Sequence, residues 1–302
     1  MVRVLASDGM DKAAARTLEE AGYEVVQQFY EAEELKERVK EFDVLVVRSA
    51  TRVREEVIDA ALSSGRLKLI IRGGVGMDNI DVSYAREHGI KVSNTPAASS
   101  VSVAELAIAH MFSLARFLYI SNVTMREGRW EKKAYKGTEL CGKTLGLVGM
   151  GRIGRETAIR ASALGMHVIY TNQSGPKQDL PYEWKSLDDL LRESDYVSLH
   201  MPGRKGSPAL LTREKIALMK DGAFLINTSR GVLVDPEALC DALDSGHLQG
   251  AAMDVYVEEP CRDERILHHP KISMTPHIGA ATKEAQEKIG EETVRIIREM
   301  FG

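Results

Sequence analysis

The chain has 302 residues, of which 44% are hydrophobic and 28% charged, and its formal net charge is −4. This length suits two domains better than one, and the charge gives no general attraction to nucleic acid or to anionic membranes. Cys141, Cys240 and Cys261 are far apart and odd in number. This argues against a disulfide framework or a metal site and favours a reducing compartment, the cytoplasm.

Short apolar runs that predict strands alternate with amphipathic runs that predict helices. The expected strands cover residues 2–6, 44–48, 69–72, 91–93, 144–148, 167–170, 196–199, 223–227, 250–254 and 271–274. The expected helices cover residues 11–21, 32–40, 101–119, 155–164, 186–192, 213–219, 236–245 and 283–300. The first run reaches Asp8 at once, so it predicts a strand and not a signal peptide, and no stretch is expected to span a membrane.

This alternation predicts an α/β fold with two doubly wound parallel-sheet domains. The long helical segments 101–119 and 283–300 are interpreted as the connections between the domains. A discontinuous, flavodoxin-like substrate domain is expected from 1–95 plus 281–302. A Rossmann dinucleotide-binding domain is expected from 96–280.

The segment KTLGLVGMGRIG, residues 143–154, carries the motif of a dinucleotide site. A predicted strand leads into Gly149, Gly151 and Gly154, and a helix follows. One glycine permits the tight turn, one lets the backbone approach a pyrophosphate, and one lets the helix pack close to the strand. A glycine turn without a ligand is the alternative, but the strand and helix around the motif favour a cofactor.

The acid that usually binds the ribose hydroxyls is missing after the next strand, where Asn172 stands. An amide can bind ribose but does not repel a 2′-phosphate, and Lys177 lies nearby. NAD is therefore expected, with NADP as an alternative. Asn172 could also be an ordinary turn residue.

Three segments in the second half place reactive groups after predicted strands, where open α/β sheets build their sites. They contain Arg230, Glu259 and His277. A histidine can take a hydroxyl proton as hydride leaves, with a carboxylate to orient it, while an arginine grips a carboxylate or ketone. Each residue alone could equally be an ordinary loop residue. His88 and His110, in predicted helices, are expected to be packing or surface residues.

The glycine motif, NTSRG, AAMDVYVEEP and TPHIGAAT resemble, in order and context, the D-isomer-specific 2-hydroxyacid dehydrogenases. The resemblance implies that His277 is the acid/base, Glu259 its partner and Arg230 the substrate-polarising residue. It implies that Asp254 contacts the nicotinamide carboxamide and that His200 and Pro202 line the adenine side. The implied cofactor-binding set is Gly149, Gly151, Arg152, Ile153, Gly154, Asn172, His200, Pro202, Thr228, Asp254 and Gly279.

The N-terminal segments VRSATRV and RGGVGMDNID also follow apolar strands. Backbone N–H groups around Gly74, Val75 and Gly76 could hold a carboxylate, and Arg48 and Arg72 a second anion. The sequence thus predicts a substrate with two anionic ends. The alternative is that both arginines are solvated or pair with nearby acids.

These segments, together with RWEKK, GTELCGKTLG and ATKEAQ, resemble the phosphoglycerate dehydrogenase branch of the family. The resemblance implies oxidation of D-3-phosphoglycerate to 3-phosphohydroxypyruvate, in serine biosynthesis, with Arg48 and Arg72 on the phosphate. It also implies a homodimer through the region 98–135. The sequence ends at Gly302, after the last predicted helix, so feedback through an appended serine-sensing domain is not expected.

Two alternatives stay open. An NADPH-dependent glyoxylate or hydroxypyruvate reductase is favoured by Asn172 and Lys177, and opposed by the two arginines. A dinucleotide-sensing binding protein, like the corepressors built on this fold, would share the catalytic pattern but usually has disordered tails. A turnover assay separates enzyme from sensor.

Overall fold

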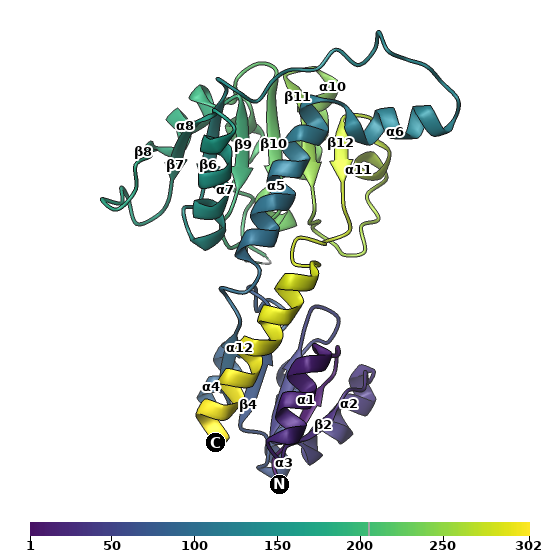
Figure 1. Cartoon of the computed structure of the whole chain (residues 1–302), viewed down its shortest axis with the longest axis vertical. Coiled ribbons are helices and arrows are strands. Elements are labelled where there is room, and N and C mark those ends of the chain that lie inside the picture. Colours follow the sequence, from purple (N-terminus) through teal and green to yellow (C-terminus); the bar gives the residue numbers. More distant parts are fainter. Residues whose placement is uncertain (205) are drawn as a thin grey trace. The chain divides into compact units, whose positions relative to one another are not determined.

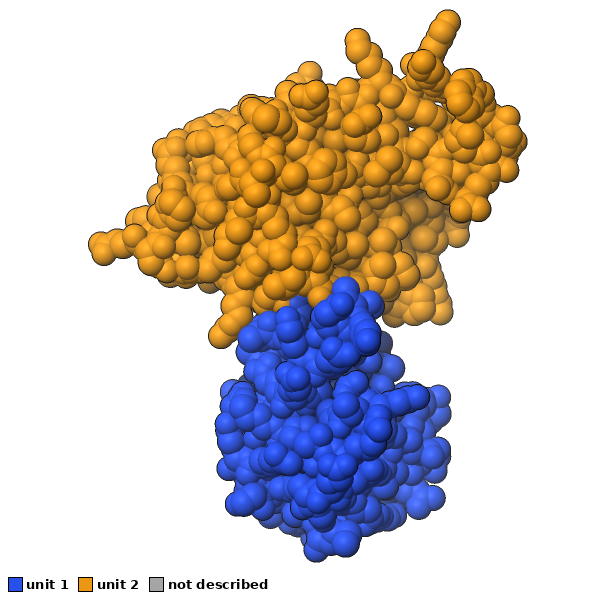
Figure 2. All heavy atoms as spheres, in the orientation of Figure 1, with its two compact units in different colours: residues 1–99, 280–302 blue, residues 100–279 orange. Residues whose placement is uncertain are grey.

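The computed structural model of the chain describes residues 1–204 and 206–302. The chain divides into two units, drawn in different colours in Figure 2. Unit 1 consists of residues 1–99 and 280–302, and unit 2 of residues 100–279.

Unit 1 is a sheet of five parallel strands with helices on both faces. The strand order, β2-β1-β3-β4-β5, is that of flavodoxin-like folds. Its strands are β1 (Arg3–Ala6), β2 (Glu24–Val26), β3 (Val44–Val47), β4 (Leu69–Arg72) and β5 (Lys91–Asn94). Its helices are α1 (Lys12–Glu20), α2 (Ala32–Arg38), the 3-10 helix η1 (Val39–Glu41), α3 (Glu55–Ser64), α4 (Val82–Glu87) and α12 (Lys283–Phe301).

The apolar strands of unit 1 send alternate side chains to two cores. Leu5 and Leu45 pack with α2 and α3 on one face, whereas Val4 and Val46 pack with α1 and α12 on the other. Helices α1 and α12 lie side by side although the sequence separates them widely (Figure 1). Gly290 permits this close approach, because a Cβ there would lie 2.7 Å from the Cβ of Ala14.

Unit 2 is a sheet of seven parallel strands in the order β12-β11-β10-β9-β6-β7-β8. The strands are β6 (Thr144–Val148), β7 (His167–Thr171), β8 (Glu183–Trp184), β9 (Tyr196–Leu199), β10 (Ala223–Asn227), β11 (Leu248–Met253) and β12 (Ile272–Met274). The helices are α5 (Ser100–Ala115), α6 (Leu118–Arg126), α7 (Arg152–Ala163), α8 (Leu187–Glu193), α9 (Arg213–Ile216), η2 (Gly231–Leu233), α10 (Pro236–Asp244) and α11 (Glu264–His268).

The strand order of unit 2 reverses between β6 and β9, which is the switch point of a Rossmann fold. Helices α5 and α7 cover one face (Figure 1), where Met111 and Ala158 pack on Leu145 and Ile226 of the sheet. Helices α8 and α10 cover the other face and pack on residues such as Leu225. The predicted fold class, two doubly wound parallel sheets, is confirmed.

One predicted helix, 101–119, is wrong in its extent. Helix α5 ends at Ala115, Phe117 takes a left-handed conformation with φ 55°, and α6 then leaves at 63° to α5. Apolar periodicity runs through the break, so the sequence pattern does not reveal it. Within the described residues no single helix is long and apolar enough to cross a membrane, although the bent pair α5–α6 passes that test together.

Several short elements were missed as well: β2, β8, α3, α6 and α11. The helix predicted around His88 is α4, which ends at Glu87 with His88 as its C-cap. Strand β2 has three half-buried residues at the edge of its sheet, and β8 has two exposed ones, so neither carries an apolar run. The strand predicted for 250–254 ends at Met253, which leaves Asp254 in the following loop. Helix α7 begins at Arg152, three residues earlier than predicted, and so takes Ile153 and Gly154 into its first turn.

Candidate active site

The glycine loop lies at the switch point of unit 2, between β6 and α7. Gly149 has φ 106°, and a Cβ there would lie 2.3 Å from the carbonyl oxygen of His200, in the loop after β9. A Cβ on Gly154 would lie 2.2 Å from the carbonyl oxygen of Gly149, so the helix packs tightly against the turn. Gly151, the N-cap of α7, would direct a Cβ into open space. Two glycines therefore serve the fold, and the third leaves room for a ligand at the helix N-terminus.

A pocket of about 550 Å³ opens beside this loop. Its lining includes the predicted residues Gly149, Gly151, Asn172, His200 and Pro202. Other lining residues could not be predicted, because they are apolar or ordinary loop residues without a motif: Val148, Met150, Thr171, Gln173, Ser174, Leu187, Met201 and Leu210.

Buried polar atoms near this pocket test whether it fits a dinucleotide. Both amide atoms of Asn172 and Nδ1 of His200, which line the pocket, are buried without a hydrogen-bond partner in the described chain, as is Oγ1 of Thr228 in the loop after β10. Buried polar groups normally have partners, so these atoms fit a polar ligand. His200 is neutral at physiological pH, since burial lowers its pKa to about 4, and its Nε2 lies 2.9 Å from Oγ of Ser198. Hydrogen-bond donors and acceptors of this kind fit the polar groups of a dinucleotide such as NAD.

Asn172 follows β7 directly, at the position where the ribose ligand of the fold is expected. Lys177 lines the same pocket, and its backbone N–H donates to the hydroxyl of Tyr170 over 2.7 Å. This hydrogen bond ties the 172–177 turn to the buried end of β7. An amide and a lysine, with no carboxylate between them in the sequence, therefore line the part of the pocket that follows β7.

Glu259 and His277 form a hydrogen-bonded pair in the loops after β11 and β12. Oε2 of Glu259 lies 2.7 Å from Nδ1 of His277, and the side chains are 38% and 37% exposed. A carboxylate can only accept, so Nδ1 carries the hydrogen and Nε2 is left as the proton-accepting atom. The other carboxylate oxygen, Oε1, accepts from the backbone N–H of Tyr256 over 3.1 Å, which fixes the carboxylate plane.

Glu259 is ionised at neutral pH. Burial by itself raises its pKa, but the hydrogen bond and charge of His277 lower it, with help from the Tyr256 N–H and the charge of Arg230. The net effect is a pKa below the ordinary carboxyl value. The negative charge that orients His277 thus persists over the whole neutral range.

The segment that carries His277 is held by Asp254, which is 1% exposed. Oδ1 of Asp254 accepts from the N–H of Ile278 over 2.8 Å, and Oδ2 accepts from the N–H of Gly279 over 2.9 Å. His277 itself has φ 54°, a left-handed conformation that non-glycine residues rarely adopt. The neighbouring hydrogen bonds hold this unfavourable conformation in place.

Arg230 follows β10 and precedes the 3-10 helix η2. Its Nη1 donates to the carbonyl of Ser229 over 2.6 Å, and its carbonyl accepts from Asn227 over 2.8 Å. A Cβ on Gly231 would lie 2.0 Å from the carbonyl carbon of Tyr256, so the Arg230 loop touches the loop that leads to Glu259. The structure thus brings the loops of Arg230, Glu259 and His277 together at the carboxyl ends of β10, β11 and β12.

Unit 1 holds the predicted substrate residues at the ends of two adjacent strands. Val47 pairs with Arg72 in register, so Arg48 and Arg72 emerge at the same edge. Asp8 accepts the N–H of Arg48 over 2.6 Å, while the guanidinium of Arg48 has no partner within the described residues. The Arg72 guanidinium covers Gly74, since a Cβ on Gly74 would lie 1.4 Å from Nη1.

The loop after β4 presents backbone donors. Gly74 has φ 146°, and its carbonyl accepts from the N–H of Thr95 over 3.0 Å. The carbonyl of Val75 accepts from the Asn94 amide over 2.6 Å. These bonds fix the loop by its carbonyls and leave the N–H groups of Val75 and Gly76 without a partner in residues 1–204 and 206–302.

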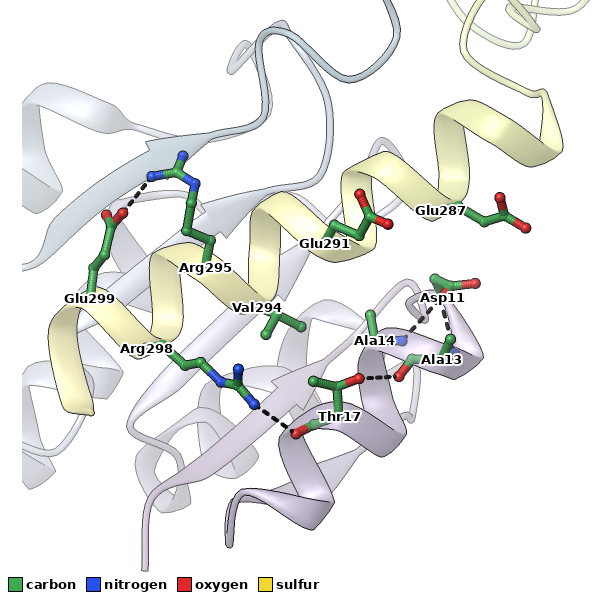
Figure 3. A pocket seen from close by; sticks show the side chains of 10 residues that line it. All are labelled: Asp11, Ala13, Ala14, Thr17, Glu287, Glu291, Val294, Arg295, Arg298 and Glu299. Carbon is green, nitrogen blue, oxygen red and sulfur yellow. Dashed lines mark hydrogen bonds and ion pairs between the residues drawn. The ribbon is translucent and has the colours of Figure 1, made fainter.

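A larger groove, of about 730 Å³, lies between α1 and α12 (Figure 3). None of the predicted site residues lines it. Several of its polar groups are engaged locally: Asp11 caps α1, Arg298 donates to the carbonyl of Thr17, and Arg295 pairs with Glu299. Size alone therefore does not mark the site, whereas the smaller pocket has both the glycine loop and the buried unpartnered atoms.

A Rossmann sheet, a glycine loop that needs its glycines and a hydrogen-bonded His–Glu pair define a class, the dinucleotide-dependent dehydrogenases. Residues 108–279 match the family described as "D-isomer specific 2-hydroxyacid dehydrogenase, NAD binding domain". The chain belongs to this family, and the resemblance predicted from its motifs is confirmed.

The chain is 47% identical to the hydroxypyruvate reductase of Thermotoga maritima, over 99% of this chain and 98% of that protein. It is 41% identical to the D-3-phosphoglycerate dehydrogenase of Methanocaldococcus jannaschii, over 100% of this chain and 58% of that protein. It spans about half the length of the other phosphoglycerate dehydrogenases that it matches.

A solved structure from Thermus thermophilus superposes with a TM-score of 0.89 at 40% identity, over 97% of this chain and 94% of that chain. Other solved neighbours hold NAD or NADPH. The chain is thus an NAD-dependent D-2-hydroxyacid dehydrogenase by family, and NAD is its family cofactor.

Proposed function

We propose that the chain oxidises D-3-phosphoglycerate to 3-phosphohydroxypyruvate, a step of serine biosynthesis, with NAD as the hydride acceptor. The observation that carries the proposal is the pair Arg48 and Arg72 at adjacent strand ends of unit 1. A guanidinium is a strong ligand for phosphate, because its planar fork binds two oxygens at once. The N–H groups of Val75 and Gly76 would bind the carboxylate.

Unit 2 would supply the chemistry. When bound, NAD would supply the hydride acceptor for C2 of the substrate. Nε2 of His277 would accept the hydroxyl proton, and Glu259, 2.7 Å from Nδ1, would stabilise the resulting imidazolium. Arg230 would bind the C2 oxygen and the adjacent carboxylate oxygen, and its charge would stabilise the negative charge that develops on the C2 oxygen in the transition state.

The chain's own residues would also hold the cofactor. The N–H groups of Arg152 and Ile153 open α7 and would bind the pyrophosphate, with Gly151 leaving the space. Asn172 would bind the ribose, His200, Pro202 and Thr228 would border the adenosine, and Asp254 and Gly279 the nicotinamide. We propose NAD as the preferred form, with NADP accepted because no carboxylate follows β7.

A second substrate has its own support. The relative from Thermotoga maritima matches over nearly its whole length, and its name is hydroxypyruvate reductase. Hydroxypyruvate and 3-phosphohydroxypyruvate share the 2-keto acid that His277 and Arg230 would act on. They differ only at C3, so the two arginines of unit 1 are the residues that decide between them.

We further propose that the chain forms a homodimer through the region 98–135. Large apolar side chains are exposed there on α5, α6 and the following loop, and Trp130 is 78% exposed. The others are Phe112, Leu118, Val123 and Met125. Exposed apolar side chains gathered in one segment are typical of a protein interface.

We place the protein in the cytoplasm. Cys141 is exposed, Cys261 half-buried and Cys240 buried, and all three are free thiols. Exposed thiols persist in a reducing compartment, which supports this placement.

The decisive experiment is a steady-state comparison of D-3-phosphoglycerate with D-glycerate, and of 3-phosphohydroxypyruvate with hydroxypyruvate. Two charge-assisted contacts to phosphate contribute about 3–6 kcal/mol, so kcat/KM should favour the phosphorylated substrate by roughly 10²–10⁴. Arg48→Ala should remove much of this preference and spare the unphosphorylated reaction. Arg52→Ala, in the same segment, is the matched control and should leave the preference intact. Equal use of both substrates by the wild type would refute the phosphate proposal and favour the reductase.

A further inference from the structure

A network of buried and half-buried hydrogen bonds links helix α5 to the segment that carries His277. Nε2 of His110 lies 3.0 Å from Oγ1 of Thr275, and that hydroxyl donates to Oδ1 of Asp254 over 2.6 Å. On its other side, Nδ1 of His110 lies 3.2 Å from Oγ of Ser273, which lies 3.1 Å from Oγ of Ser113. His110 is 3% exposed, so the sequence expectation of a packing residue misses a fully hydrogen-bonded polar group.

The hydrogens in this chain can be assigned from the donors available. Thr275 has one hydroxyl hydrogen and gives it to the Asp254 carboxylate, so it can only accept from His110. His110 must therefore carry its hydrogen on Nε2. Burial lowers the pKa of His110, although the charge of Asp254 raises it in part, so the ring is neutral and Nδ1 accepts from Ser273. Every donor then points toward Asp254.

This hydrogen-bond network ends at Asp254, the residue that fixes the backbone around His277. Asp254 accepts from the Thr275 hydroxyl and from the N–H groups of Ile278 and Gly279, just after His277. His277 has the left-handed φ of 54°. Such a conformation persists only where neighbouring contacts over-determine it. Without the Thr275 donor, only the two N–H groups would hold the Asp254 carboxylate, so the backbone around His277 would be less firmly fixed.

We propose that His110 is a positioning residue for the acid/base: through Thr275 it fixes the Asp254 carboxylate, and thereby the backbone conformation that aims His277. The proposal rests on the role of His277 proposed above. It assigns a function in the reaction to a helix residue that touches neither substrate nor cofactor.

The test compares four variants of the full chain. His110→Leu keeps the volume and removes both hydrogen bonds, whereas His110→Gln can still donate to Thr275 and accept from Ser273. Thr275→Val removes the link to Asp254. Met111→Val, at the next position of α5, is the matched control. Met111 is fully buried but packs in the apolar core, away from the hydrogen-bond network.

The first readout is backbone amide exchange of the 275–280 segment, by mass spectrometry, in the protein without cofactor or substrate. We expect exchange at Ile278 and Gly279 to be roughly tenfold faster in His110→Leu and Thr275→Val. His110→Gln should return it to near the wild-type rate. Met111→Val should change exchange only as far as it lowers global stability.

The second readout is kcat with a saturating substrate. His110→Leu and Thr275→Val should each lower kcat by about tenfold with little change in NADH affinity, and the double variant should lose no more than either alone. Two results would overturn the proposal. One is a loss of kcat in the double variant equal to the product of the two single losses. The other is a His110→Leu variant with wild-type kcat and exchange rate and only a lower Tm. His277→Gln distinguishes a failure of the proposed function from a failure of the His110 proposal. If His277→Gln stays active, the proposed function fails, whatever the His110 variants show.

Discussion

Replacing Glu259 by Gln removes one charge and keeps the size of the side chain. Glu259 lies 2.7 Å from Nδ1 of His277, and a hydrogen bond to a charged group contributes about 1.5–3 kcal/mol. Both side chains are more than a third exposed, so solvent screening places the contribution near the lower end, about 1.5 kcal/mol. Since about 1.4 kcal/mol corresponds to tenfold in rate, kcat/KM should fall by roughly tenfold.

The loss should appear in kcat as well as in kcat/KM, because the carboxylate stabilises the imidazolium that forms as the proton is transferred. The assay is NADH formation at neutral pH, with NADH affinity measured separately by fluorescence. Glu258→Gln is the matched control, since Glu258 is exposed and adjacent but forms no hydrogen bond or ion pair with His277 within the described residues. A Glu259→Gln enzyme with more than half of the wild-type kcat/KM would refute the assignment, as would an equal loss in the control.

Glu259→Gln should also change how the stability of the fold depends on pH. Interactions in the folded state lower the pKa of Glu259 below the ordinary 4.5, so its charge stabilises the fold above that value. The contribution is lost as the pH falls through the lowered pKa. The difference in Tm between wild type and Glu259→Gln should therefore be constant near neutrality and shrink in acid. A difference that grows as the pH falls would contradict the lowered pKa.

Three further predictions concern the cofactor and the interface. Asn172→Asp should shift the ratio of kcat/KM for NAD and NADP toward NAD by at least about tenfold, because the new charge repels the 2′-phosphate; an unchanged ratio would place selectivity elsewhere. Gly149→Ala should lower stability by more than about 1–2 kcal/mol, the cost of its left-handed backbone alone, whereas Gly151→Ala should leave Tm unchanged and weaken NADH binding. Equal Tm losses in the two glycine variants would contradict their separate roles. Trp130→Glu should convert the dimer to a monomer in light scattering, while a wild type that is already monomeric would refute the interface.

The fold class could be predicted because its signals are local. Parallel strands covered on both faces are continuous apolar runs, and the helices between them carry a 3.6-residue period. The elements that escaped prediction are short or lie at sheet edges, such as β8 with two exposed residues. The break at Phe117 escaped because a single left-handed residue changes no apolar pattern.

The glycine loop could be predicted because a single short segment contains all of its glycines. The glycine loop needs three residues in a row of six, and each has the environment that the motif requires. The pairing of Glu259 with His277 depends on the adjacency of β11 and β12, which spacing in the sequence does not reveal. The hydrogen bonds of His110 could not be predicted for the same reason, because its partners, Ser273 and Thr275, are more than 160 residues away in the sequence.

The division of the chain has a consequence for how specificity changes. The glycine loop, the His277–Glu259 pair and the chain of hydrogen bonds behind it all lie within unit 2. The arginines proposed to bind phosphate lie in unit 1, at the ends of β3 and β4. If these arginines bind phosphate as proposed, substitutions at those strand ends would exchange a phosphate for a hydroxyl at C3 without disturbing the proton transfer. Such a separation would allow relatives named for two different substrates to exceed 40% identity to one chain along nearly its whole length.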